Sequence, residues 1–258
     1  MKIFTNLPAF KDFKNQLTDH SIGLVPTMGN LHAGHISLIK RANDENDLVV
    51  LSLFVNPTQF NNPHDYQNYP KTIEADLAKA KEAGVDMVLM PTEQEMYPDD
   101  YQYRIHSEAN IGKVMEGTAR LGHFEGMMTI VLKLLLLCQA NRAYFSEKDY
   151  QQLALIKGIT KAFLIDTTIV ACPVIRLQSG LPLSSRNSRF TPTQLQKAEK
   201  FALLSRSYQD ISKLKASLLQ DDIQIDYIEE HFGRRYLAVH VEGVRLIDNF
   251  PLKDIITS

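Results

Sequence analysis

The sequence is poor in cysteine, with only Cys138 and Cys172 among 258 residues. Two thiols are too few for a disulfide framework or for a cysteine-rich metal site. Both cysteines lie in apolar runs, where a buried free thiol in a reducing compartment is the expected state.

Long hydrophobic runs are also missing. The most apolar stretch, residues 127–138, is too short to cross a bilayer and contains Lys133. The first residues, Met1 to Phe4, lack the apolar core of a signal peptide. We therefore expect a cytoplasmic protein without a membrane partner.

The chain has no excess of positive charge, since 28 basic and 30 acidic residues give a net charge of −2. This balance argues against a nucleic-acid binder that relies on a broad positive surface. The glycine-rich P-loop and G-x-G-x-x-G motifs are absent as well, so a nucleotide site would have to be built in another way.

Short apolar runs alternate with helical patterns over the first three-fifths of the chain. This alternation predicts a parallel sheet with right-handed crossovers, and hence an α/β, Rossmann-like domain. The predicted strands are 22–25 (closed by Pro26), 48–55, 85–90, 142–145 and 167–172, and the predicted helices are 34–43, 72–83, 126–138 and 149–163.

The pattern changes after Pro173. A loop over 178–192 precedes one long helical pattern over 194–219, and short strand patterns follow at 223–228, 236–241 and 244–249. Glu242-Gly243 is a typical hairpin turn. We predict a Rossmann-like domain over 1–174 and a smaller α+β lid domain over 175–258, with ligands at the carboxyl ends of the parallel strands.

The most informative motif is PTMGNLHAGH, residues 26–35, between a predicted strand and a predicted helix. Helix N-termini attract phosphates, and Gly29 and Gly34 would allow close backbone approach. His32 and His35 can donate to the same phosphate group. The alternative is a surface turn with two incidental histidines, but the position between strand and helix favours a nucleotide site.

Three further segments are polar and follow predicted strands or lie in the loop. Asn56 and Gln59, in FVNPTQF, suit a hydroxy acid, although a polar turn is the plainer interpretation. Lys148 could bind a phosphate oxygen and Asp149 could cap a helix or help hold a cation. The segment Leu183–Asn187 offers two hydroxyls and a guanidinium, a suitable polyphosphate clamp or else a solvated turn.

A weaker group, Glu116 to Phe124, combines glycines with titratable side chains before a predicted helix. It is either a loop that lines the site or a structured turn.

The strings PTMGNLHAGH, FVNPTQF, YFSEKDYQQL and SSRN, in this order and spacing, closely resemble the pantothenate synthetase (pantoate–β-alanine ligase) family. The similarity covers roughly residues 21–190 and resumes at Ile225–Tyr227 and Arg245–Asn249.

This resemblance implies an ATP-dependent ligase that joins pantoate to β-alanine through pantoyl adenylate, needs Mg2+ and forms a homodimer. It implies that His35 is the proton donor and that Gln59 and Gln152 hold pantoate. The implied ATP-binding residues are Met28, Gly29, Asn30, Leu31, His32, Ala33, Gly34, His35, Ser146, Glu147, Lys148, Asp149, Ile175, Leu183, Ser184, Ser185 and Arg186.

The chain departs from the family pattern at several positions. Ser146 replaces a usual glycine, Leu183 a usual methionine, and Glu125 a common basic residue. Ala75 replaces an acidic residue, which removes a carboxylate that could serve Mg2+. The C-terminal region also looks short around 230–236.

Two other functions fit parts of the pattern. A nucleotidyltransferase acting on a phosphate ester would share His32 and His35 but would not need Gln59 and Gln152. A nucleotide-binding sensor could keep the same helix start without proton donation from His35. Pyrophosphate exchange into ATP, with pantoate alone, separates the ligase from both.

Overall fold

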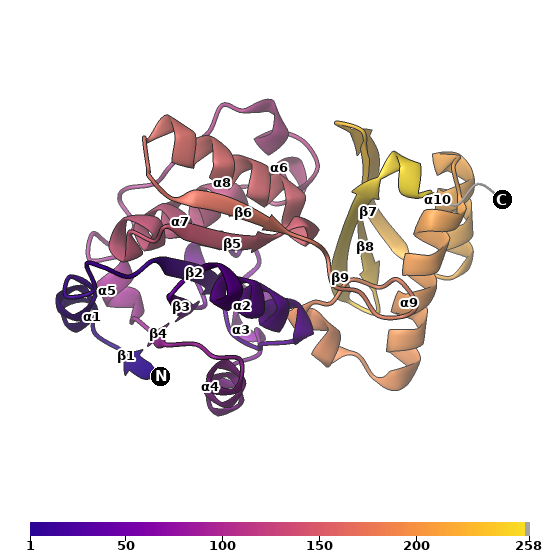
Figure 1. The fold of residues 1–258 in the computed structure, drawn as a ribbon. Helices are drawn as coiled ribbons and strands as arrows, with labels where there is room; N and C mark the ends of the chain where they lie inside the picture. Colours follow the sequence, from indigo (N-terminus) through magenta and orange to yellow (C-terminus); the bar gives the residue numbers. More distant parts are fainter. Residues whose placement is uncertain (256–258) are drawn as a thin grey trace. The chain divides into compact units, whose positions relative to one another are not determined.

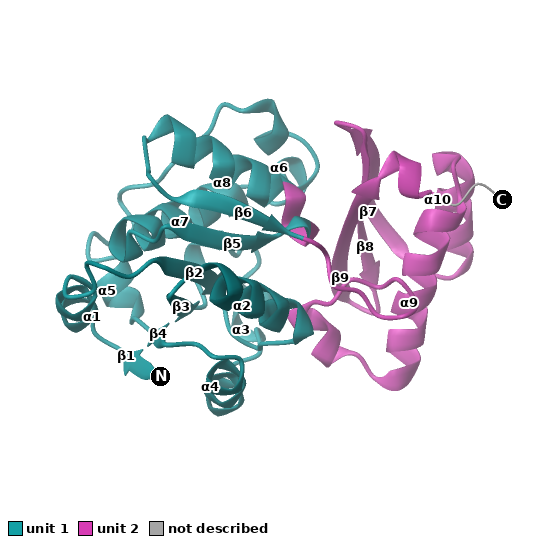
Figure 2. Cartoon of the chain, viewed as in Figure 1, with its two compact units in different colours: residues 1–147, 151–172 teal, residues 148–150, 173–258 magenta. Residues whose placement is uncertain are grey.

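The computed structural model describes residues 1–255, and they form two compact units (Figure 2). Unit 1 contains Met1–Glu147 and Gln151–Cys172. Unit 2 contains Lys148–Tyr150 and the chain from Pro173 onward. Three residues, Lys148–Tyr150, thus group with unit 2 although their sequence neighbours group with unit 1.

Unit 1 is built on a six-stranded parallel sheet with the order β1-β4-β3-β2-β5-β6 (Figure 1). The strands are β1 (Lys2–Phe4), β2 (Ile22–Thr27), β3 (Leu48–Leu53), β4 (Met87–Leu89), β5 (Arg142–Ser146) and β6 (Thr168–Cys172). The Rossmann-like fold predicted from the sequence is confirmed.

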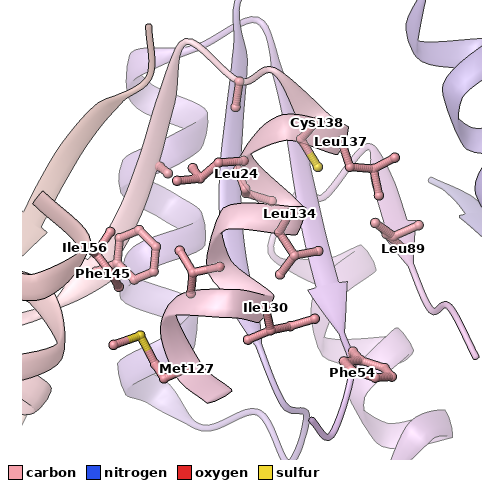
Figure 3. Packing of buried hydrophobic residues seen from close by; sticks show 14 of the residues in the cluster. Leu24, Phe54, Leu89, Met127, Ile130, Leu134, Leu137, Cys138, Phe145 and Ile156 are labelled. Carbon is pink, nitrogen blue, oxygen red and sulfur yellow. The ribbon is translucent and has the colours of Figure 1, made fainter. Parts of the chain in front are cut away.

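Helices cover both faces of this sheet. The unit-1 helices are α1 (Leu7–Lys14), α2 (Ala33–Glu45), α3 (Pro63–Gln67), α4 (Ile73–Glu82), α5 (Glu93–Met96), α6 (Glu116–Ala119), α7 (His123–Cys138) and α8 (Tyr150–Ala162). Since neighbouring strand residues face opposite sides, Leu24 packs with α7 and α8, and Val25 packs with α2 and α4. Figure 3 shows Met127, Ile130 and Leu134 of α7 within the first of these clusters. Within the described residues 1–255, no helix has the length and apolarity needed to span a membrane.

Several strand boundaries differ from the prediction, two of them in β2 and β3. Pro26 lies inside β2 rather than closing it, and β3 ends at Leu53 rather than at Val55. Proline has no N–H to donate to the ladder, and side chains complete the pairing beside it. Thr27 Oγ1 donates to Ser52 O at 2.7 Å, and Thr27 N donates to Ser52 Oγ at 3.3 Å.

Unit 2 has an antiparallel sheet of β7 (Gln224–His231), β8 (Arg234–Val241) and β9 (Val244–Pro251). The predicted turn at Glu242-Gly243 is confirmed, since φ is 49° and 76° at the two residues, both in the left-handed region that this hairpin turn requires.

The single helix predicted over 194–219 was wrong, because two helices lie there: α9 (Pro192–Ser207) and α10 (Ile211–Gln220). The guanidinium of Arg235, which is fully buried, donates to the carbonyl oxygens of Tyr208 and Gln209 (2.6 Å for Gln209). Asp210 then caps α10 by accepting from Ser212 N at 2.7 Å. A distant arginine therefore stabilises a break that the local pattern does not indicate.

Candidate active site

Three of the polar segments follow the carboxyl ends of adjacent strands β3, β2 and β5. Residues 28–35, called the histidine loop below, comprise the connection from β2 to α2 and the first three residues of α2. Asn56 and Gln59 follow β3, and Glu147 follows β5. Ligands of open α/β sheets bind at this edge, so the sheet places these segments where a substrate would lie.

Backbone N–H groups fix the tautomers of the two histidines of this loop. His32 is the N-cap of α2, and its Nδ1 accepts from Gly34 N at 3.1 Å. His35 Nδ1 accepts from His32 N at 3.3 Å, and the ring centroids lie 4.1 Å apart. A neutral imidazole that accepts at Nδ1 carries its proton on Nε2. Both rings therefore present a donating Nε2–H from the start of one helix.

A buried carboxylate holds the backbone of the histidine loop. Asp76 of α4, 2% exposed, accepts from Asn30 N at 2.9 Å and from Leu31 N at 2.7 Å. Gly29 and Asn30 have φ of 84° and 48°, a left-handed backbone that needs such support at Asn30. Lys79 Nζ donates to Leu31 O at 2.6 Å.

Sequence reasoning missed Asp76 and Lys79 as parts of this site. Their partners lie 45 to 48 positions earlier in the chain. The only local signal was an acidic residue in the first turn of a helix, which is common for helix-dipole reasons alone.

Gln59 is held by its neighbours at the end of β3, in the short helix η1 (Pro57–Gln59). Asn56 Nδ2 donates to Gln59 Oε1 at 3.0 Å, and Gln59 Nε2 lies 3.1 Å from Met28 Sδ. Tyr97 donates its hydroxyl to Asn56 Oδ1 at 2.6 Å, and burial raises the pKa of Tyr97, which keeps that hydroxyl protonated. The two amides predicted from the sequence are therefore in contact.

Residues of the weaker group at 116–124 bind the backbone carbonyl oxygen of Gln59. His123 Nδ1 donates to Gln59 O at 2.8 Å, and Arg120 Nη2 donates to the same oxygen at 3.2 Å. Arg120 Nη1 lies 3.2 Å from His123 Nε2, which accepts because Nδ1 holds the proton. Arg120 and His123 of this group thus position a predicted substrate residue.

The two glutamines at the start of α8 have different environments. Gln151 is buried and donates to the carbonyl oxygens of Ile111 (2.6 Å) and Val114 (2.9 Å). Gln152, the residue predicted to hold pantoate, is half-buried. Gln151 therefore has a packing role, and Gln152 keeps exposed surface for a ligand.

Ser146 is the last residue of β5 in unit 1, and the other remaining predicted residues belong to unit 2. Lys148 Nζ lies 3.4 Å from Asp149 Oδ1. Leu183 N donates to Ile175 O at 3.0 Å, so these two predicted positions are in contact. Ser184 is the N-cap of the short helix η4 (Ser185–Arg189), and its Oγ accepts from Arg186 N at 3.3 Å.

No preformed metal site is evident: within residues 1–255, no group of three or more His, Cys, Asp or Glu side chains is arranged to hold an ion. Mg2+ often binds through substrate phosphates and only one or two carboxylates. Asp76 does not fit that role, since it is buried and both of its oxygens accept backbone N–H groups. The side chain of Asp149 is 42% exposed and fits it better.

Comparison with known proteins gives a consistent result. The model of the pantoate-beta-alanine ligase family matches residues 2–251. Pantothenate synthetase of Coxiella burnetii is 49% identical over 250 residues, which cover 97% of this chain and 96% of the relative. Pantothenate synthetase of Legionella pneumophila is 49% identical over 253 residues, covering 98% and 100%.

Solved structures agree with the sequence matches. The pantoate-beta-alanine ligase of Francisella tularensis, crystallised with beta-gamma ATP and beta-alanine, superposes with a TM-score of 0.96 at 44% identity and covers 98% of both chains. Pantothenate synthetase of Thermus thermophilus gives a TM-score of 0.87 at 34% identity, covering 98% of this chain and 99% of the other.

Proposed function

The chain belongs to the pantoate–β-alanine ligase family, and on that premise we propose how its residues carry out the reaction. The protein condenses pantoate with β-alanine in an ATP-dependent reaction that gives pantothenate. We propose a pantoyl-adenylate intermediate. The carboxylate of pantoate attacks the α-phosphorus of ATP and pyrophosphate leaves, after which the amine of β-alanine attacks the acyl carbon and AMP leaves.

The reciprocal capping of His32 and His35 is the observation that carries this proposal. Both rings hold their proton on Nε2 and lie 4.1 Å apart at a helix start. Negative charge grows on the α-phosphate and on departing pyrophosphate, and fixed donors there stabilise the transition state. His35 donates at the reacting phosphate, and His32 supports it. The other residues of the loop, from Met28 to Gly34, line ATP at the start of the same helix.

Gln59 and Gln152 hold pantoate. Gln59 is oriented by Asn56 at 3.0 Å, so its amide meets a substrate with its rotamer already fixed. Such orientation matters because the nucleophile is the substrate's own carboxylate, and positioning rather than an enzyme nucleophile gives the rate.

The residues of unit 2 bind the rest of ATP. Lys148 supplies a compact positive charge to the phosphates. Arg186 supplies a planar guanidinium whose N–H groups, with the adjacent serine hydroxyls, donate hydrogen bonds to the phosphates. Ile175 and Leu183, joined by a 3.0 Å backbone hydrogen bond, contribute an apolar wall for the nucleotide. Ser146 and Glu147 line the same nucleotide from the end of β5.

Asp149 is the carboxylate of the chain that would help to hold Mg2+ beside the phosphates of ATP. When bound, the ion would supply positive charge beside the leaving pyrophosphate. The functional protein is a cytoplasmic homodimer, in keeping with the family resemblance, and sedimentation velocity at micromolar concentration tests that assembly.

Product analysis tests the proposed route. With pantoate, β-alanine, ATP and Mg2+, we expect pantothenate, AMP and pyrophosphate in equal amounts. ADP and inorganic phosphate in place of AMP and pyrophosphate would indicate an acyl-phosphate route and would refute the adenylate. Omission of Mg2+ in the presence of a chelator should abolish turnover.

A further inference from the structure

Two neighbouring polar residues, Asp248 and Asn249, lie on β9 with 2% and 3% exposure. Buried polar side chains are costly unless their hydrogen bonds are satisfied. We propose that this pair positions both ATP-binding segments of unit 2, with Asn249 acting on Lys148 and Asp248 acting on the hairpin that bears Ile175 and Leu183. The inference rests on the proposed function, since it assumes that those segments contact ATP.

Asn249 acts as an oriented clamp on the backbone of Lys148. Its Nδ2 donates to Lys148 O at 2.7 Å. Its Oδ1 accepts from Arg234 at 2.9 Å (Nε) and 2.7 Å (Nη2). Arginine can only donate and a carbonyl can only accept, so the amide has one possible orientation. The Arg234 guanidinium also lies 4.2 Å from the ring centroid of Tyr150, two residues beyond Lys148.

Asp248 performs the matching task for the hairpin. It forms a bidentate pair with Arg176 at 2.7 and 2.8 Å, and its own side chain is fully buried. Arg176 Nη1 also donates to Gly180 O at 2.9 Å, which ties the two sides of the hairpin together. Arg176 directly follows Ile175, the residue bonded to Leu183.

The two clamps are coupled through β9 itself. Asn249 N donates to Asp248 Oδ1 at 2.7 Å, and Arg176 Nη2 donates to Asn249 O at 3.2 Å. A single strand segment thus fixes the backbone next to the Lys148 ammonium and the backbone next to the apolar wall. Asp248 and Asn249 touch no substrate in this scheme, and they act through the residues that do.

Asn249→Asp is the sharpest test. The new carboxylate keeps and strengthens the partnership with Arg234, but it cannot donate and places an oxygen against Lys148 O. We expect a folded protein with an apparent KM for ATP raised about tenfold, the effect of losing one buried hydrogen bond. The KM for β-alanine should stay within about twofold of the wild-type value, since the proposed effect is confined to nucleotide binding.

A double-mutant cycle separates positioning from general loosening of the sheet. If Asn249 acts through Lys148, the double variant Lys148→Ala/Asn249→Asp should have the same KM for ATP as Lys148→Ala. Asp226→Asn is the matched control. It makes the reverse exchange between carboxylate and amide, weakens a 2.7 Å ion pair with Arg245 in the same sheet, and should behave as the wild type.

Two results would overturn the inference: a wild-type KM for ATP in Asn249→Asp, or full additivity in the double variant. If Asn249→Asp does not fold, Arg234→Met replaces it in the test, because loss of the guanidinium allows the Asn249 amide to rotate. Arg234→Met should raise the KM for ATP and show the same non-additivity with Lys148→Ala. A wild-type KM in Lys148→Ala would instead refute the proposed role of Lys148, and this inference with it.

Discussion

Replacement of Asp76 by alanine should damage both the stability and the nucleotide site of unit 1. The carboxylate accepts two backbone N–H groups of the histidine loop, at 2.9 and 2.7 Å, and the Thr72 hydroxyl at 3.1 Å. Each buried donor left without a partner costs about 1–3 kcal/mol. Two such donors give a loss of about 2–6 kcal/mol in the free energy of unfolding.

A loss of this size is easy to detect. For a protein of this length, 1 kcal/mol corresponds to about 2–4 °C, so the melting temperature should fall by about 4–24 °C. The loop that carries Asn30 in a left-handed conformation should relax, and the KM for ATP should rise by at least about tenfold. Asp76→Asn keeps one acceptor and should show about half of the stability loss.

Glu74→Ala is the control for Asp76. Glu74 lies in the same first turn of α4 and is exposed, so its removal should change stability by less than about 0.5 kcal/mol. Thermal unfolding followed by circular dichroism, with ATP titration of the same samples, provides the assay. Wild-type melting and a wild-type KM for ATP in Asp76→Ala would refute the claim that this carboxylate holds the histidine loop.

Other expectations test different parts of the molecule. Gly126→Ala should lose about 1–3 kcal/mol and raise the KM for pantoate, because the added carbon would lie 2.3 Å from a carbonyl oxygen of η1; normal kinetics would contradict this. Hydrogen bonds to Glu125 and Glu108 raise the pKa of His106. His106→Gln should therefore lower the free energy of unfolding most below pH ~6.5, and the loss should vanish as pH rises through the raised pKa. Urea unfolding at several pH values measures this dependence. Arg186→Ala should weaken ATP use, with only partial recovery in Arg186→Lys because an ammonium lacks the planar fork; equal kcat/KM in all three proteins would exclude a clamp.

The parts of the site that were predictable from the sequence are those with local signals. His32 and His35 stand between a strand and a helix start with glycines on either side, and all of these features lie within ten residues. The parallel sheet could also be predicted from the sequence, because a strand that is buried on both faces consists almost entirely of apolar residues.

The features that escaped prediction depend on distant partners. Asp76 reaches Leu31 across 45 positions, and nothing in the sequence around either residue indicates the pairing. The break between α9 and α10 depends in the same way on Arg235, whose contacts with Tyr208 and Gln209 span 27 and 26 positions. The sequence predicts that Pro26 closes a strand, and hydrogen bonds from Thr27 to Ser52 explain why the strand continues.

Pyrophosphate exchange into ATP, measured with pantoate and Mg2+ in the absence of β-alanine, tests the central claim most directly. Reversible formation of pantoyl adenylate at the histidine loop predicts that labelled pyrophosphate appears in ATP and that omission of pantoate stops the exchange. His35→Ala should slow this exchange by about two to four orders of magnitude, as expected for the loss of a preorganised donor. Absence of exchange in the wild-type protein, or an unchanged rate in His35→Ala, would contradict the account.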